Sequence, residues 1–178
     1  MKRIPWPGLL ALSIVLPAQA ATVATVASPD GRLQVELDLN GEGRLAYRVL
    51  RDGKRLVDDS RLGFIFADGR QFLRNLALDG QARSTVDQTW EQPWGERRFV
   101  RDHHNELRAT FVEADRDKRR FHVVFRVFDD GLGFRYELPR QPALQQVAIQ
   151  QELTEFAIAR PATAWWIPAF EWNREEYL

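Results

Sequence analysis

The last fourteen residues contain the side chains that are best suited to chemistry. They combine three carboxylates with five aromatic rings, which are Glu171, Glu175, Glu176, Trp165, Trp166, Phe170, Trp172 and Tyr177. Aromatic rings stack on sugars, and acidic oxygens exchange protons or bind hard cations. Such residues together are typical of a carbohydrate site or a calcium site. The segment therefore predicts one of these sites, or a part of one.

The spacing of the carboxylates leaves two interpretations open. If Asn173 caps a helix, Glu175 and Glu176 lie in its first turn, where the helix dipole stabilises negative charge. In the alternative, one of these carboxylates is a ligand of a divalent cation. Calcium takes about six to eight oxygen ligands, so this segment could supply only part of a calcium site.

A second aromatic cluster surrounds Trp94. Pro93 and Gly95 flank this residue, and the pattern predicts a loop that offers no strand or helix face to bury the ring. An exposed indole can stack on the apolar face of a pyranose. The alternative is that Trp90 and Trp94 close one end of the hydrophobic core.

The three histidines do not favour a metal site. His103 and His104 are adjacent, so they point to opposite sides of an extended chain. His122 lies within an apolar run. We expect all three to be core or edge residues whose ring nitrogens have hydrogen-bond partners. The sequence also lacks a nucleophile motif, a glycine-rich phosphate loop and a His-x-x-x-His motif.

Composition limits the class of protein. The 178 residues suffice for one domain with a sizeable core. Lys and Arg number 25, as do Asp and Glu, so the formal net charge of zero gives no indication of a nucleic-acid partner. Cysteine is absent, which excludes disulfides and thiolate metal sites within this sequence.

The first twenty residues have the parts of an export signal in the required order. Residues 2–3 are basic, residues 9–16 form an apolar run, and Pro17 precedes the small-residue cleavage site over 18–20. The run is too short to span a bilayer, although a buried first strand or helix is the alternative. We predict a signal peptide over 1–20 with cleavage after Ala20, export to the periplasm, and no membrane span after cleavage.

The next residues have the alternation of an antiparallel sheet. We expect 21–27 to be a lead-in of small residues and 28–31 to be a turn. Apolar residues then alternate over 33–39, which predicts a strand with one buried face. Residues 40–43 have the backbone freedom for a tight turn, and 45–49 alternate again as an antiparallel partner.

The second half of the sequence repeats this pattern. Residues 106–113 alternate, whereas 121–128 are apolar at nearly every position, which predicts a strand covered on both faces. A turn over 129–131 leads to a returning strand over 133–138. No long segment has helical periodicity, and about six to ten strands with many turns favour two packed sheets. We predict an all-β fold, a β-super-sandwich of two packed antiparallel sheets, over 28–178. The alternative is that further strands of this sandwich follow Leu178.

Four stretches, in this order, resemble the N-terminal domain of glycoside hydrolase family 97, the bacterial α-glucosidases and α-galactosidases. They are Ser-Pro-Asp-Gly-Arg-Leu-Gln-Val at 28–35, the Trp94 cluster with His-Asn-Glu-Leu at 89–107, Phe-Arg-Val-Phe-Asp-Asp-Gly-Leu-Gly-Phe-Arg-Tyr at 125–136, and the aromatic and acidic segment at 166–178. Together they cover nearly all of the chain that follows the signal.

The resemblance implies a larger enzyme, an exo-α-glycosidase that acts on α-linked oligosaccharides. In that family a (β/α)8 barrel and a small β-domain follow the sandwich, and the catalytic carboxylates lie in the barrel. We therefore expect no catalytic residue in this chain, no activity of the chain alone, and a barrel domain after Leu178 as its partner.

The resemblance also implies a calcium ion beside the scissile bond, to which the N-terminal domain contributes one glutamate. The matching residue is Glu176, with Glu175 as the alternative because this sequence has two acids where the family commonly has one. Trp94 and Asn105 are candidates for lining the sugar pocket from the sandwich side.

Two other functions stay open. One is a free-standing carbohydrate-binding module that uses Trp94 and the tryptophans of the last segment as stacking platforms. The other is a structural scaffold whose aromatic segment only docks the next domain.

Overall fold

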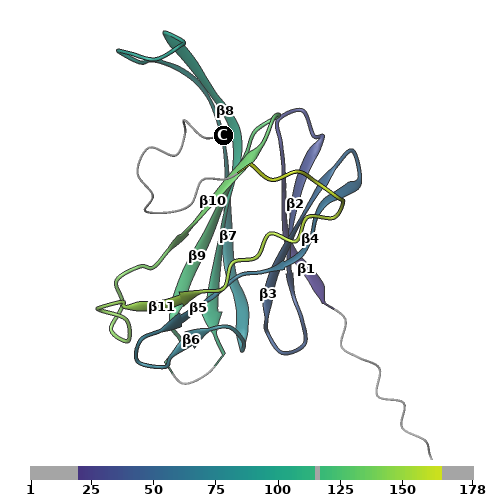
Figure 1. Ribbon diagram of the computed structural model, residues 1–178. Helices are drawn as coiled ribbons and strands as arrows, with labels where there is room; N and C mark the ends of the chain where they lie inside the picture. The colour runs from purple at the N-terminus through teal and green to yellow at the C-terminus, as the bar shows by residue number, and fades with distance from the viewer. Residues whose placement is uncertain (1–19, 115–116, 166–178) are drawn as a thin grey trace, which may run out of the picture.

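The computed structural model describes residues 20–114 and 117–165, and two four-stranded antiparallel sheets face each other in it (Figure 1). The first sheet has the order β1-β2-β3-β4, with β1 (Ala21–Ala27), β2 (Leu33–Leu39), β3 (Leu45–Arg51) and β4 (Lys54–Arg61). The second has the order β10-β9-β8-β7, with β7 (Leu76–Glu91), β8 (Phe99–Glu113), β9 (Arg120–Val127) and β10 (Leu132–Glu137). The predicted all-β sandwich is confirmed.

A third, smaller sheet lies at one end of the sandwich. Its order is β11-β5-β6, with β5 (Phe64–Phe66), β6 (Gln71–Phe72) and β11 (Ile149–Glu152). These short strands bring the number of strands in the described residues to eleven, one more than the upper end of the expected range. The described part of the chain contains no helix, and hence none long and apolar enough to cross a membrane.

The residues that we expected to be a lead-in form strand β1. This strand pairs antiparallel with β2, from Ala21 opposite Leu39 to Ala27 opposite Gln34. Ala24 and Val26 are buried, because their period-two alternation with threonine and alanine places both on the inner face. The sandwich thus begins at Ala21 and not at the turn over 28–31.

The turn over 40–43 forms as predicted, and it also touches the second sheet. The Asn40 side-chain oxygen accepts hydrogen bonds from the backbone N–H groups of Glu42 and Arg44, at 3.0 and 2.9 Å. Gly43 has a φ of 66°, and a Cβ atom there would lie 2.5 Å from the backbone nitrogen of Leu76. Only glycine fits this close approach between the two sheets.

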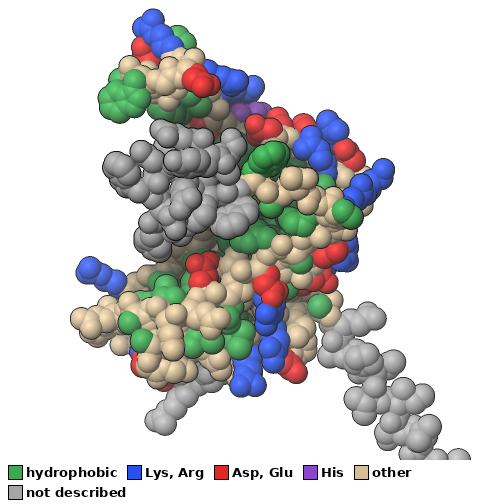
Figure 2. All heavy atoms as spheres, in the orientation of Figure 1, with side chains coloured by type: hydrophobic (Ala, Val, Ile, Leu, Met, Phe, Trp, Pro, Cys, Tyr) green, Lys and Arg blue, Asp and Glu red, His purple; other side chains and the backbone are tan. Residues whose placement is uncertain are grey.

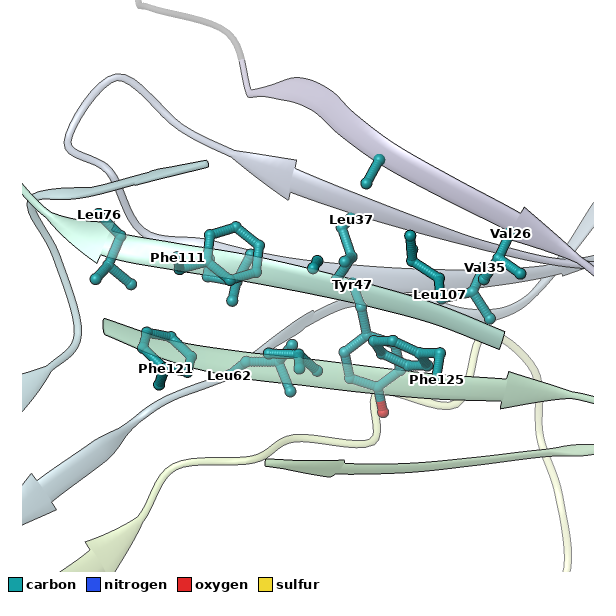
Figure 3. Close-up of a cluster of buried hydrophobic side chains, with 14 of the residues drawn as sticks. Val26, Val35, Leu37, Tyr47, Leu62, Leu76, Leu107, Phe111, Phe121 and Phe125 are labelled. Atoms are coloured by element: carbon teal, nitrogen blue, oxygen red, sulfur yellow. The ribbon is translucent and has the colours of Figure 1, made fainter. Parts of the chain in front are cut away.

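Most of the core consists of the side chains that both large sheets direct into the space between them (Figure 3), and Phe64, Phe66 and Phe72 of the third sheet complete it. The β2 and β3 register places Val35 opposite Val49 and Leu37 opposite Tyr47, so their apolar side chains share one face. The Tyr47 ring lies 5.9 Å from that of Phe125 on β9, measured between centroids. The Tyr47 hydroxyl donates to the backbone oxygen of Glu155 at 2.8 Å, which satisfies its only polar group.

Strand β9 is covered on both faces at only one position. Phe121, Val123, Phe125 and Val127 point into the core and are fully buried. On the outer face Val124 is fully buried, but His122 is half-buried and Arg126 is exposed. The expectation of two covered faces is therefore correct at Val124 and wrong at Arg126, whose guanidinium pairs with Glu106 at 2.8 Å.

A buried ion pair closes the end of the core near the third sheet. The Arg119 guanidinium and the Glu113 carboxylate form a double hydrogen bond, and both side chains are almost completely buried. The guanidinium also lies 5.0 Å from the centroid of the Phe72 ring. Each charge is stabilised by the other, because an isolated charge at this depth would be strongly destabilising.

Candidate functional site

Strands β7 and β8 extend beyond the sandwich as a two-stranded ribbon (Figure 1). They pair with each other as far as Glu91 opposite Phe99. Strand β9, however, ends its pairing with β8 at Val127 opposite Asn105. Residues 86–104, which we call the arm, therefore lack the third strand and the facing sheet that cover the rest of β8.

The arm exposes large aromatic side chains. Trp94 is 83% exposed, Phe99 56% and Trp90 48%, and Figure 2 shows hydrophobic and basic side chains together at the end of the arm. The interpretation that Trp90 and Trp94 close one end of the core is wrong, because the arm holds both away from it. The loop position predicted for Trp94 is confirmed.

The strand register divides the arm into two faces. Directly paired residues of antiparallel strands share a face. One face carries Val86 with His104, Gln88 with Asp102, and Trp90 with Val100. The opposite face carries His103, Thr89 and Phe99, together with Asp87 and Arg101, which form two hydrogen bonds of 2.8 Å. The first face is the more apolar of the two.

His104 and Asp102 lie at the base of the arm, where it joins the sandwich. His104 is 1% exposed, its Nδ1 lies 2.5 Å from Asp102 Oδ1, and its ring is 4.9 Å from the Phe128 ring. Partial burial works to raise the pKa of Asp102, but hydrogen bonds from His104 and Gln88 outweigh it and lower the pKa. Asp102 is thus held as a carboxylate that fixes the orientation of the His104 ring.

The second nitrogen of His104, Nε2, is buried and has no hydrogen-bond partner among the described residues, which is also true of Asp38 Oδ1 and Arg119 Nη1. The expectation that the ring nitrogens are paired is therefore wrong at this atom. His122, in contrast, hydrogen-bonds through Nδ1 to Thr110 Oγ1 at 2.9 Å, as expected of an edge histidine. The sequence carried a signal for the Asp102–His104 contact, because residues two apart on a strand share a face.

Asn105 points inward and holds strand β1 against the second sheet. Its Nδ2 donates to the Ala27 backbone oxygen at 2.9 Å, and its Oδ1 accepts from Thr85 Oγ1 at 2.7 Å. Arg83 donates to the Thr25 backbone oxygen at 2.8 Å beside them. A groove of about 500 Å³ lies along this junction and is lined partly by Asn105. The amide of Asn105 is therefore already engaged in a structural contact.

Trp94 and Asn105, the two candidate site residues that the structure describes, lie far apart along the arm. Six residues of extended strand, on the order of 20 Å, separate Asn105 from Phe99, and Trp94 lies farther along in the loop of the arm. Glu175 and Glu176 lie outside the described residues, as do residues 1–19 of the signal predicted over 1–20. Of the C-terminal aromatic residues only Trp165 is described, and it is 83% exposed. Within 20–114 and 117–165 no group of three or more His, Asp or Glu could hold a metal ion.

The comparison with known families decides what kind of domain this is. Residues 26–178 match the family model described as glycosyl-hydrolase 97 N-terminal. The chain belongs to this family. The resemblance inferred from the sequence motifs is therefore confirmed, and the family match covers nearly the whole sandwich.

Solved structures of two glycosidases share this fold. A glycoside hydrolase family 97 enzyme from Pseudoalteromonas sp. strain K8, solved in complex with panose, is 40% identical with a TM-score of 0.78 over 86% of this chain and 23% of its own. A β-arabinopyranosidase is 29% identical with a TM-score of 0.69 over 76% of this chain and 21% of its own.

Curated relatives are α-galactosidases. A retaining α-galactosidase of Bacteroides thetaiotaomicron is 29% identical over 128 residues, which are 72% of this chain and 18% of that protein. A probable retaining α-galactosidase of Streptomyces bingchenggensis is 32% identical over 160 residues, which are 88% of this chain and 24% of that protein. The chain thus spans about a quarter or less of the length of each relative.

Proposed function

We propose that this chain is the non-catalytic N-terminal β-sandwich domain of an exported, calcium-dependent exo-α-glycosidase of the α-glucosidase or α-galactosidase type. The observation that carries the proposal is the family match over 26–178, combined with relatives about four times as long. The domain packs on a (β/α)8 barrel that supplies the catalytic carboxylates. An intact Met1 in the secreted protein would contradict the export signal.

The substrate class follows from what the relatives bind and cleave. The Pseudoalteromonas enzyme was solved with panose and with acarbose, and the curated relatives are named α-galactosidases. An α-linked oligosaccharide is common to both groups. Trp94 suits the wall of such a sugar pocket, since 83% of its surface is free to stack. Asn105, whose amide is engaged with strand β1, is the weaker candidate for lining that pocket.

The domain lends the enzyme one calcium ligand, Glu176, with Glu175 as the alternative. A hard divalent cation prefers carboxylate oxygens and needs more of them than one glutamate supplies, so the remaining ligands come from the barrel. Beside the scissile bond the ion polarises the leaving group or orients the catalytic carboxylates. A ligand shared between two domains would also couple their positions.

The adjacent glutamates provide a matched pair for the test. In the full-length enzyme, Glu176→Gln should lower kcat/KM on maltose or an aryl α-galactoside, and raise the calcium concentration for half-maximal activity by at least about 10-fold. Glu175→Gln should change neither quantity by more than about 2-fold, since it would leave the ligand set intact. The reverse result would assign the ligand to Glu175, and unchanged calcium dependence in both variants would refute the shared site.

The exposed tryptophans favour a second candidate, a carbohydrate-binding module. Trp94 and Trp90 lie on a projecting ribbon, where a sugar could stack on either ring. Calorimetry of this chain with maltose and with galactosides tests the idea. Heat of binding that disappears in Trp94→Ala would support a module, whereas no heat at millimolar sugar would count against it.

A further inference from the structure

A groove follows the edge of the sandwich between strands β10 and β4. Residues 153–159 run beside β4, to which two backbone hydrogen bonds of 2.7 and 3.0 Å join them (Figure 1). One hollow of about 360 Å³ lies between this segment and β10, and a second of about 310 Å³ continues toward β3 and the turn over 129–131. Leu132 and Phe156 line both hollows. We call the two hollows together the Phe156 groove.

The ring of Phe156 forms a platform in the middle of this groove. It is 65% exposed, although it packs on Tyr47 and Phe134, with ring centroids 6.4 and 6.0 Å apart. The core therefore holds the ring while the larger part of its surface stays open. A ring held in this way can stack on the apolar face of a pyranose with little further loss of side-chain entropy.

Hydrogen-bonding groups lie at one end of the platform. Glu152 and Thr154 line the same hollow as Phe156. The Thr154 hydroxyl donates to Glu152 Oε1 at 2.6 Å, and the Tyr136 hydroxyl lies 2.7 Å from Thr154 Oγ1. Glu152 Oε2 accepts no hydrogen bond from the described residues. A carboxylate that is oriented through one oxygen can accept the hydroxyl hydrogens of a ligand through the other.

Charged groups lie at the opposite end of the platform. Arg51 and Asp130 line the second hollow. Neither side chain forms a hydrogen bond or an ion pair within residues 20–114 and 117–165. The groove thus offers a ring with a donor and acceptors around it, which matches a sugar, whose apolar ring face is surrounded by hydroxyl groups.

The same charges argue against a protein surface as the occupant. The buried centre of a protein interface is depleted of charged side chains, whereas this groove has Glu152, Arg51 and Asp130 beside its ring. Its volume also favours a small ligand. Ligand pockets measure about 300–1,000 Å³, so each hollow is at the small end of that range and suits one sugar ring.

We propose that the Phe156 groove binds a short α-linked oligosaccharide, with one ring of the sugar stacked on Phe156 and its hydroxyls on Glu152. The ring, the carboxylate and the guanidinium indicate a carbohydrate by themselves, and the choice of an α-linked sugar rests on the proposed function. The groove lies outside residues 86–104, so it is independent of the exposed tryptophans of the arm.

Calorimetry of the purified 178-residue chain with maltose and with melibiose tests the groove. Phe156→Ala should raise the Kd at least about 5-fold, because the stacking platform is lost. Glu152→Gln should also raise it at least about 5-fold, because a charged acceptor becomes a neutral amide. Glu152 is exposed, so this variant keeps the test valid if Phe156→Ala impairs folding.

Two control variants match the test. Ile158→Ala changes an apolar residue of the same segment that is 57% exposed and lines neither hollow, so the Kd should stay within about 2-fold of the parent value. Trp94→Ala should likewise leave the Kd within about 2-fold, because the ring stands on the arm. Urea unfolding of each variant shows whether the sandwich is folded.

The possible outcomes separate the groove from the proposed function. No heat at millimolar sugar, or an equal loss of binding in Ile158→Ala, overturns the groove. Binding that is lost in Trp94→Ala and kept in Glu152→Gln overturns it as well, since the sugar then binds to the arm. Either result, with α-glycosidase activity in the full-length enzyme, leaves the proposed function standing. Sugar binding that both groove variants weaken, in a protein whose full-length form has no α-glycosidase activity, supports the groove and contradicts the proposed function.

Discussion

The two halves of strand β8 differ in burial although both pair with β7. In the sandwich half Leu107, Ala109 and Phe111 are fully buried, whereas in the arm Phe99 is 56% exposed. The two halves have different neighbours, because only the sandwich half has β9 beside it and the first sheet in front of it. Backbone pairing alone therefore builds an extended strand, and a facing sheet is what turns one side of it into a core.

This contrast separates the region that stabilises the domain from the region whose large aromatic side chains stay exposed. The sandwich half buries apolar surface that contributes roughly 25 cal/mol per Å² to folding, while the exposed rings of the arm contribute much less in the isolated chain. Substitutions in the two regions should therefore differ in what they change.

Phe125→Ala should have the largest effect on stability. The ring is fully buried and lies 5.9 Å from Tyr47 and 5.0 Å from Phe134, so its removal leaves a cavity between the two sheets. We expect a loss of about 4 kcal/mol in the free energy of unfolding. Trp94→Ala, at an exposed position of the arm, should change it by no more than about 0.5 kcal/mol. Urea unfolding of the purified chain measures both, and similar losses would contradict the division between core and arm.

Tyr136 should make the sandwich sensitive to alkaline pH. Burial raises the pKa of its hydroxyl to about 12, although hydrogen bonds from Thr154 and the backbone oppose the shift. Because the folded pKa exceeds the unfolded value of 10.0, the stabilisation is fully present below pH 10 and is lost as pH rises toward 12. Since the two pKa values differ by about 2 and each such unit is worth about 1.4 kcal/mol, this loss approaches 3 kcal/mol.

Tyr136→Phe serves as the control for this pH effect. The variant cannot ionise at this position, so its stability should fall less steeply above pH 10 than that of the parent chain. Some dependence should remain, because burial also raises the pKa of Tyr47. An unchanged slope in urea unfolding between pH 9 and 11 would show that Tyr136 is accessible to solvent in the folded chain.

Asn105→Ala should have the smallest effect of the three and should decide between two roles for that residue. If the amide mainly holds β1 through Ala27, with Thr85 of β7 orienting it, its loss should cost about 1 kcal/mol of stability. The KM of the full-length enzyme for its α-glycoside should then stay within about 2-fold of the parent value. A several-fold rise in KM without loss of stability would instead place Asn105 in the sugar pocket.

The histidines and the arm show why part of the candidate site could not be predicted. The burial of His104 depends on Phe128, which lies outside its own strand. The exposure of Trp90 depends on the position at which β9 ends. No local pattern in the sequence predicts the burial of His104 or the exposure of Trp90. The contact between Asp102 and His104 was accessible from spacing alone, because both lie on one strand and two residues apart.

The sequence by itself determined the all-β class, the turns at 40–43 and 129–131, and the family, because alternation, turn residues and motifs are local properties. Only the tertiary structure decided that 21–27 form strand β1, that Asn105 is used to hold it, and that Trp94 stands clear of the core. The physical reason is that burial requires a facing surface. That surface is contributed by residues far away along the chain, so no local pattern records whether it is present.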